Sequence, residues 1–238
     1  MNAATITSDT LAKLREVCAA TLTTQLFKLG FRNTFIPGLQ VLSPKQRMAG
    51  EAVTLRLVPA REDLATFEAT SRPGYAQRVA IEGIKPGQVL VVEARGVMGA
   101  AVGGEIYMTR LKVLGAGGYV IDGCIRDYPA IQELGFPVYA KGAASPPHPV
   151  KHLAAEVNVP IGCAEVLVMP GDIMVGDGEG VVCVPRHVAD QVAQSGAELD
   201  RLEAFVLEKI RAGAPVPGTY PPNEATLKEY EVWKRGSK

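Results

Sequence analysis

The sequence predicts an α/β fold, in which one domain is built on a mixed sheet and helical arms lie at its two ends. Strand-like and helix-like segments alternate through the middle of the chain, which is typical of a sheet covered by helices. The run Val89–Val92 is apolar and largely β-branched, as in a strand buried on both faces. A long amphipathic segment, 186–211, follows several short strand-like segments and predicts a terminal helix.

The first third of the chain contains one predicted helix and the first predicted strands. Ser8 or Asp9 can cap a helix with one apolar face, and Gly30 is suited to end it. Residues 49–58 alternate as a half-buried strand does, and a helical stretch follows them. Lys85–Gln88 contains proline and glycine in a tight-turn pattern and leads into the strand 89–92.

The middle of the chain is rich in glycine and is expected to alternate between helices, strands and one functional loop. The expected elements are a helix at 104–115, a strand at 119–121, a functional loop at 122–127, a helix at 129–134 and a strand at 137–140. A proline-rich surface loop is expected at 142–160.

The last third begins with short strands separated by turns and ends in helices. Strands are expected at 165–168, 172–175 and 181–184. The four prolines within 213–222 exclude a regular helix there. Asn223 can then cap a final helix at 224–234.

Composition and charge exclude several classes of protein. Lys+Arg and Asp+Glu are both 25 in 238 residues, so the basic surplus of a nucleic-acid binder is absent, as is that of a protein attracted to an acidic membrane. No apolar run approaches a membrane span, and the first ten residues lack a signal-peptide pattern. The four cysteines are far apart, which indicates reduced thiols. We therefore expect a cytoplasmic protein.

The strongest candidate site is the segment Val120–Asp127. A strand ends here, Gly123 interrupts it, and Arg126 and Asp127 follow where α/β proteins place ligands. Arginine presents a planar fork that matches a carboxylate, and aspartate can bind a hard cation such as magnesium. An equally good interpretation from the residues alone is a structural ion pair between Arg126 and Asp122.

Two further segments have weaker claims to a ligand. Gly103–Ile106 precedes a predicted helix, and free amides at a helix start can bind an anion, although a simple helix entry is the more common meaning. The acid-rich turns 170–172 and 176–180 resemble solvated hairpins more than sites. His148 and His152 do not predict a zinc site, because neighbouring prolines prevent a helix that would align them.

Taken together, these segments resemble the family of regulator-of-ribonuclease-activity-A-like (RraA-like) proteins and 4-hydroxy-4-methyl-2-oxoglutarate aldolases. The resemblance covers roughly residues 20–212. Its motifs are Gly104–Tyr107, residues 118–127 with their Asp-Gly-x-x-Arg-Asp end, 134–138, 158–161, 170–172 and 176–181. It implies an α/β/β swivelling sandwich over residues 1–212, followed by a tail and C-terminal helix at 213–238. It also implies a homotrimer or a dimer of trimers, with sites between subunits.

The resemblance assigns roles to individual residues. Arg126 is expected to bind the carboxylate and keto oxygen of pyruvate or its enolate, and Asp127 to bind Mg²⁺ or Mn²⁺ through waters shared with Glu105. Gly104 and the backbone amides of Ile106 and Tyr107 are expected to complete the carboxylate pocket. An acid of a neighbouring subunit is also expected near the metal, with Glu203 the first choice and Asp200 the second.

The function that the resemblance implies is a metal-dependent aldolase. It would cleave a 4-hydroxy-2-oxo acid through pyruvate enolate and also decarboxylate oxaloacetate. The alternative is a non-catalytic regulator that binds and inhibits a ribonuclease. Arg56, Tyr107 and the 142–152 loop are candidates for lining the substrate pocket, and the substrate itself is left open.

Overall fold

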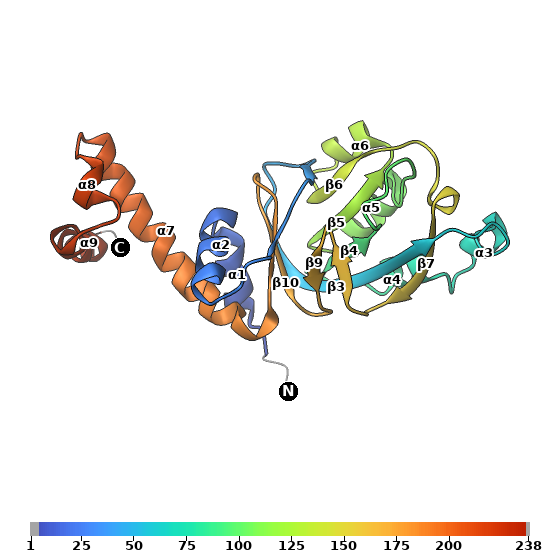
Figure 1. The fold of residues 1–238 in the computed structure, drawn as a ribbon, viewed down its shortest axis with the longest axis horizontal. Helices are drawn as coiled ribbons and strands as arrows, with labels where there is room; N and C mark the ends of the chain where they lie inside the picture. Colours follow the sequence, from blue (N-terminus) through green and yellow to red (C-terminus); the bar gives the residue numbers. More distant parts are fainter. Residues whose placement is uncertain (1–4, 237–238) are drawn as a thin grey trace.

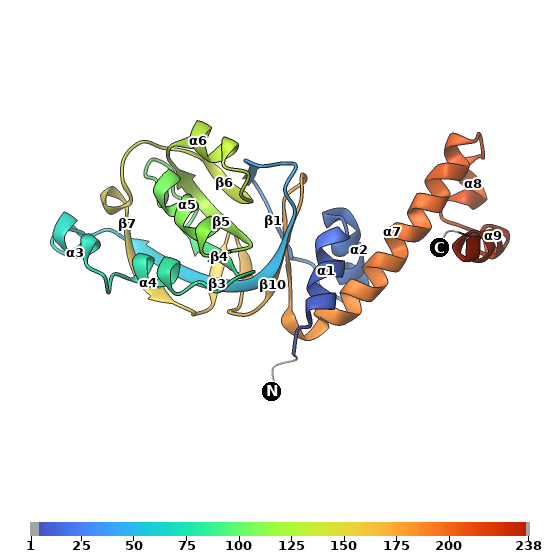
Figure 2. The same ribbon diagram turned by 180° about the vertical axis from the view of Figure 1, so that it is seen from behind.

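The computed structural model describes residues 5–236 and consists of one curled mixed sheet, a small hairpin, and helices on the outer face and at one end (Figure 1, Figure 2). The strands are β1 (Phe35–Ile36), β2 (Gln40–Val41), β3 (Met48–Pro59), β4 (Val89–Glu93), β5 (Gly118–Ile125), β6 (Val138–Ala143), β7 (His152–Val157), β8 (Ile161–Cys163), β9 (Val166–Val168), β10 (Ile173–Gly176) and β11 (Val181–Val184). The helices are α1 (Ser8–Glu16), α2 (Ala19–Lys28), α3 (Phe67–Ser71), α4 (Ala76–Glu82), α5 (Glu105–Val113), α6 (Tyr128–Glu133), α7 (Ala189–Arg211), α8 (Val216–Thr219) and α9 (Glu224–Gly236), with 3₁₀ turns η1 (His148–Val150) and η2 (Arg186–Val188).

The sheet has the order β1-β11-β10-β3-β4-β5-β6-β2, and β7 pairs with β3 outside this path. Strands β3, β4, β5 and β6 run parallel to one another, whereas β10, β11, β7, β1 and β2 join antiparallel. The α/β class and the mixed sheet predicted from the sequence are therefore confirmed. Because parallel strands end at one edge, residues that follow β4 and β5 are brought together there.

Three apolar cores hold the layers together. Helices α4 and α5 cover one face of the parallel strands around Leu90, Met108 and Ile121. The curl of the sheet encloses a second core, which the β8–β9 hairpin closes, and the Tyr139 hydroxyl donates to the Asp177 carbonyl across it at 3.0 Å. The third core lies between the β10–β11 end of the sheet and the helices α1, α2 and α7.

The N-terminal helix predicted from Ser8 to Gly30 is wrong as a single element, because the chain turns at Val17 and Cys18. The Asp200 carboxylate on α7 accepts from the Cys18 amide at 3.1 Å and from the Thr21 hydroxyl at 2.5 Å, so it binds the start of α2. This bend lets both short helices pack against α7 and the sheet.

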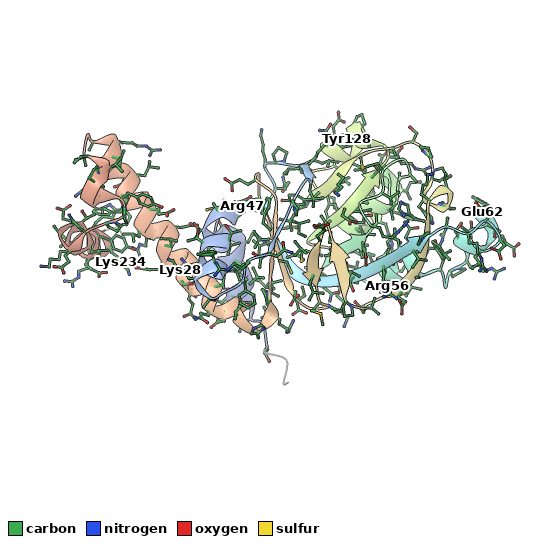
Figure 3. The ribbon with its side chains drawn as sticks, viewed as in Figure 1. Lys28, Arg47, Arg56, Glu62, Tyr128 and Lys234 are labelled. Atoms are coloured by element: carbon green, nitrogen blue, oxygen red, sulfur yellow. The ribbon has the colours of Figure 1, made fainter. Side chains whose placement is uncertain are left out.

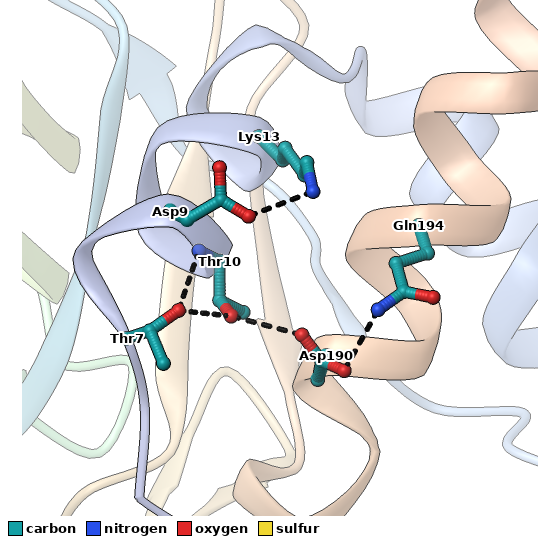
Figure 4. A network of polar contacts seen from close by, with 6 residues as sticks. All are labelled: Thr7, Asp9, Thr10, Lys13, Asp190 and Gln194. Atoms are coloured by element: carbon teal, nitrogen blue, oxygen red, sulfur yellow. Dashed lines mark hydrogen bonds and ion pairs between the residues drawn. The ribbon is translucent and has the colours of Figure 1, made fainter.

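A second set of polar contacts fixes α1 on α7 (Figure 4). The Thr10 hydroxyl donates to the Asp190 carboxylate at 3.0 Å, and the Gln194 amide donates to the other Asp190 oxygen at 2.9 Å. Thr7 caps α1 by accepting from the Thr10 amide at 3.1 Å. The beginning of α7 is therefore joined to the body of the fold by side-chain as well as apolar contacts.

Two other sequence predictions need correction. Strand β5 continues to Ile125, so residues 122–125 belong to a strand and not to a loop. The segment expected as a surface loop at 142–160 contains β7, which pairs with the distant β3. Long-range pairing decides both cases, and a local pattern does not record it.

Beyond its contact with α1 and α2, α7 runs away from the sheet and carries α8 and α9 at its far end (Figure 1, Figure 2). A small core of its own, built on Phe205, Val206 and Tyr230, joins α9 to α7. Over the described residues, no helix is both long and apolar enough to cross a membrane. The division of the chain at 212/213 stays a prediction.

Candidate active site

Arg126 and Asp127 follow directly after β5, at the edge where the parallel strands end. The loop 101–104 lies against the end of this strand, because Val102 donates to the Cys124 carbonyl at 2.9 Å and Arg126 donates to the Gly103 carbonyl at 2.9 Å. These two backbone bonds hold the start of α5 beside the two charged side chains.

The Asp127 backbone adopts the left-handed conformation, with φ 58° and ψ 36°, at the N-cap position of α6. Aspartate is among the few residues other than glycine that tolerate this region, and such conformations concentrate at functional sites. Asp127 Oδ2 accepts from the Glu105 amide at 3.1 Å and lies 3.8 Å from Arg126 Nε. Its carboxylate is therefore fixed by the first turn of α5 while its side chain stays about half exposed, at 45%.

Gly104 makes this arrangement possible. A Cβ atom at this position would lie 2.5 Å from Asp127 Oδ2, 3.0 Å from Arg126 Cγ and 3.2 Å from Arg126 Nε. The backbone of Gly104 is extended, so the requirement for glycine comes from these side chains and not from its own torsion angles. The α5 entry and the Arg126–Asp127 pair are thus in direct contact.

Asp122 has a different role from the one considered in the sequence. It is buried, and its carboxylate accepts from three backbone amides, those of Ala94, Gly96 and Ala164, the last two at 3.0 and 3.1 Å. The alternative of an Arg126–Asp122 ion pair is therefore wrong. Asp122 instead joins the end of β4 and the β8–β9 turn to β5.

The aspartates of the acid-rich turns are also structural and are buried, whereas Gly178 and Glu179 are exposed as expected of a solvated turn. Asp172 accepts from the amides of Met169 and Arg186 at 2.9 and 3.1 Å. Asp177 accepts from the Ala19 amide at 2.8 Å and so holds the start of α2. Both carboxylates are less than a tenth exposed, and neither lines the pocket described next.

A pocket of about 600 Å³ opens beside Arg126 and Asp127. It lies within the size range of small-molecule sites. Residues from five segments line it: Phe67, Thr70, Ser71, Arg78, Ala101, Val102, Gly103, Gly104, Ile106, Tyr107, Arg126, Asp127, Pro147, His148 and Pro149. Arg126 and Asp127 also line a second hollow of about 480 Å³, together with Tyr128, Pro129 and Ala143–Ser145. The two charged residues are therefore shared by both hollows.

Several predicted site residues come together at this pocket. Gly104, Ile106, Tyr107, Arg126 and Asp127 line it, and Glu105 is exposed at the first position of α5. Part of the 142–152 loop also lines it, through Pro147–Pro149.

Three other predicted residues lie elsewhere. Arg56 pairs with Glu156 on the neighbouring strand, and Figure 3 places it at the opposite side of the body from Tyr128, so its predicted place in the pocket is wrong. Glu203 lies on α7, where the Tyr220 hydroxyl is 3.5 Å from its carboxylate. The C-terminal arm formed by α7, α8 and α9 carries Lys234 at its far end, at the opposite end of the molecule from Glu62 (Figure 3). Asp200 is occupied by the start of α2.

The sequence did not identify Arg78 as a pocket residue, because it lies on α4, far from the glycine-rich region. It included His148 only as part of the 142–152 loop, and otherwise considered this histidine as a zinc ligand. Burial lowers the pKa of His148 to about 4, and the nearby charges of Arg126 and Arg78 act in the same direction. His148 is therefore expected to be neutral at pH 7 and lines the same pocket as both arginines.

The acidic side chains at the pocket suit a hard divalent cation. Within residues 5–236, Asp127 uses Oδ2 for both its hydrogen bond and its ion pair, which leaves Oδ1 for a ligand. Over the same residues, no group of three or more His, Cys, Asp or Glu side chains is suited to hold a metal ion. Mg²⁺ is commonly held by one or two carboxylates and several waters, and Asp127 with Glu105 supplies that oxygen-only set.

Comparison with known proteins gives a consistent result. A family model described as RraA-like (Aldolase/RraA) matches residues 15–183. A Halalkalibacterium halodurans protein named "Putative 4-hydroxy-4-methyl-2-oxoglutarate aldolase" is 36% identical over 54% of this chain and 61% of its own length, which is less than two thirds of that relative. An uncharacterized protein of Methanocaldococcus jannaschii is 32% identical over 73% of this chain and 77% of its own.

A solved structure from the RraA family is also similar to this chain. Streptomyces coelicolor RraAS2, described as an unusual member of the RNase ES inhibitor RraA protein family, is 30% identical. It superimposes with a TM-score of 0.74 over 85% of this chain and 97% of its own.

Proposed function

Because this chain belongs to the RraA-like (Aldolase/RraA) family, we propose that it is a divalent-metal-dependent lyase that releases pyruvate from a 4-hydroxy-2-oxo acid. One observation carries the proposal. Arg126 and Asp127 stand side by side at the start of α5, in the wall of a pocket large enough for such a substrate. The aldolase names among the relatives support the same chemistry.

The carboxylate of the substrate has two kinds of donor at this site. The Arg126 fork can form two parallel hydrogen bonds with it. The first intrahelical bond of α5 runs from Met108 to Gly104, so the amides of Ile106 and Tyr107 have no partner within the helix. Both residues line the pocket, and their amides together with the helix dipole favour an anion there.

Asp127, with Glu105 beside it, would hold Mg²⁺ or Mn²⁺ next to the keto group. When bound, the cation acts as a Lewis acid that stabilises negative charge on the keto oxygen. Two reactions need that stabilisation. Cleavage of the C3–C4 bond of a 4-hydroxy-2-oxo acid, in which the 4-hydroxyl loses its proton to solvent and becomes a carbonyl, leaves the bonding electron pair on C3 as the enolate of pyruvate. Loss of CO₂ from oxaloacetate leaves the same enolate. A proton from solvent then converts the enolate to pyruvate. Arg126, positioned by its backbone bond to Gly103, adds a fixed positive charge beside that oxygen.

Glu203 completes this proposal only if a neighbouring subunit supplies it. On its own chain it lies on the arm, away from the pocket, so a second copy must bring it near Asp127. We expect a homotrimer or a dimer of trimers. Light scattering measures the assembly, and mixing the inactive variants Arg126→Ala and Glu203→Ala should restore part of the activity. Absence of any restoration in mixed oligomers would refute a site shared between subunits.

The proposed reaction is tested by following pyruvate release from 4-hydroxy-2-oxo acids and oxaloacetate, with Mg²⁺ and with EDTA. Release that needs the metal and that falls at least roughly a hundredfold in Arg126→Ala supports the lyase. Metal-independent release, or release unchanged in Arg126→Ala, would contradict it.

A second function has a specific observation in its favour. The solved structure of RraAS2 covers 85% of this chain and is described within a family of RNase ES inhibitors. A regulator of this kind would bind an RNA-degrading enzyme and need neither Arg126 nor a metal. Inhibition of such a ribonuclease that is equal for the wild type and Arg126→Ala, together with no pyruvate release, would favour this function.

A further inference from the structure

The wall of the pocket away from Asp127 comes from α3, α4 and η1, and it is not used by the pyruvate half of the substrate. Thr70 and Ser71 belong to α3, Arg78 belongs to α4, and His148 begins η1. A three-carbon acid held by Arg126 fills only a fraction of the 600 Å³ cavity. This wall therefore has room for the other half of the substrate.

Arg78 brings a second guanidinium group into the pocket. Its Nε donates to the Thr70 carbonyl at 3.2 Å, which fixes the plane of the group. In the part of the chain that the structure describes, Arg78 has no ion-pair partner, unlike Arg56, Arg72 and Arg110, which pair with glutamates. A partly buried, oriented guanidinium without a counter-ion is suited to bind an anionic group in two-point contact.

His148 lines the same wall as Arg78 and is hydrogen-bonded to Tyr75. The Tyr75 oxygen accepts from the Ala154 amide at 2.8 Å and lies 3.1 Å from His148 Nε2. In the tautomer in which the Tyr75 hydroxyl donates to Nε2, the imidazole proton is on Nδ1. The two rings stack with centroids 5.6 Å apart, which fixes the plane of the imidazole. A neutral histidine in this state offers one N–H donor to a ligand.

We infer that Arg78, together with the Tyr75-held His148, forms a second binding subsite that selects substrates whose acceptor half bears a carboxylate. Arg78 binds the carboxylate, and His148 donates a hydrogen bond to an oxygen of the same half. These are specificity-determining residues, and no bond is made or broken at them. The inference rests on the proposed lyase function and adds the residues that choose among its substrates.

The test uses two substrates that share the reacting carbons but differ in the far group. These are 4-hydroxy-2-oxoglutarate, which carries a second carboxylate, and 4-hydroxy-2-oxopentanoate, which carries a methyl group. The ratio of their kcat/KM values is measured for the wild type, Arg78→Ala and Arg78→Lys. We expect Arg78→Ala to lower the diacid-to-monoacid ratio roughly thirtyfold, mainly through KM, and Arg78→Lys to restore part of it.

Arg72→Ala is the matched control. Arg72 lies next to the same segment and pairs with Glu68, but it does not line the pocket, so the ratio should stay unchanged. His148→Gln and Tyr75→Phe should each lower the ratio by a smaller factor of about five to ten, because each removes or misorients one neutral hydrogen bond. Equal losses for the two substrates in Arg78→Ala, or no loss for either, would overturn the inference.

A binding measurement separates this inference from the proposed function. Calorimetry compares 2-oxoglutarate with pyruvate on the wild type and on Arg78→Ala, without turnover. Weaker binding of 2-oxoglutarate alone in Arg78→Ala supports the subsite even if no pyruvate is released from any substrate. Equal affinities of the wild type and the variant for 2-oxoglutarate would refute it, whatever the activity.

Discussion

Replacing Gly104 by alanine tests how closely the position of Asp127 controls activity. The backbone at Gly104 is extended, so alanine introduces no torsional strain. The new methyl group would lie 2.5 Å from Asp127 Oδ2 and 3.0 Å from Arg126 Cγ, and these side chains must move. Restoring an ordinary contact requires a shift of roughly 1 Å in the carboxylate, and misplacement on that scale costs about a hundredfold in rate.

The effect on stability should be much smaller than the effect on rate. The shift weakens the bond from the Glu105 amide to Asp127, which is partly exposed, so the free energy of unfolding should fall by about 1–2 kcal/mol. In a chain of this size that is a decrease of about 2–8 °C in Tm. Pyruvate release gives kcat/KM, and thermal unfolding followed by circular dichroism gives Tm.

Gly103→Ala is the matched control for this substitution. Its new methyl group would lie 2.7 Å from Met108 Cε, the far end of a flexible side chain that can move aside. We expect a much smaller loss of kcat/KM than in Gly104→Ala. A folded Gly104→Ala protein with the activity of the wild type would refute the reasoning that the α5 entry positions Asp127.

Three further predictions concern the Arg126–Asp127 pair, the buried Asp122 carboxylate and two histidines of lowered pKa. Arg126→Ala and Asp127→Ala should each lower kcat/KM by at least roughly a hundredfold with an unchanged circular dichroism spectrum. Only Asp127→Ala should also weaken Mn²⁺ binding, measured by electron paramagnetic resonance. Equal Mn²⁺ binding in the two variants would contradict the assignment of the metal to Asp127. Asp122→Ala leaves three backbone amides without this acceptor, two of them in buried bonds, and should lower the free energy of unfolding in urea by about 3 kcal/mol. A loss below 1 kcal/mol would show that these bonds matter little. Burial lowers the pKa of both His148 and His152 to about 4, so the unfolded chain binds more protons than the folded chain between pH 6.5 and 4. The free energy of unfolding should therefore fall by about 1–3 kcal/mol per histidine as the pH is lowered from 6.5 toward 4. A His148→Gln/His152→Gln double variant whose stability has the same pH dependence as the wild type would contradict this.

The sequence was sufficient to predict the parts of the fold whose pattern is local. Val89–Val92 reads as a buried strand and is one, and residues 104–115 contain α5 close to the expected bounds. The candidate site was found for the same reason. Arg126, Asp127 and Gly104 belong to two short segments, and a strand end and a helix start at one sheet edge are brought together by the parallel topology.

The parts that the sequence did not predict depend on contacts between distant segments. Strand β7 forms because β3 offers it an edge, and its own residues carry no clear alternation. The break between α1 and α2 forms where Asp200, on a helix near the other end of the chain, binds the Cys18 amide. Arg78 and His148 reach the pocket from α4 and η1, and neither has a sequence motif that marks it.

The most direct test of the central claim is the exchange of the pyruvate methyl protons in D₂O, followed by proton NMR. This measurement needs no knowledge of the acceptor half, because it reports formation of the enolate at the Arg126–Asp127 site alone. We expect the wild type with Mg²⁺ to exchange the methyl protons far faster than Mg²⁺ without protein. EDTA, Asp127→Ala and Arg126→Ala should each remove that acceleration. Exchange by the wild type no faster than by free Mg²⁺, or exchange unaffected by Asp127→Ala, would contradict the account.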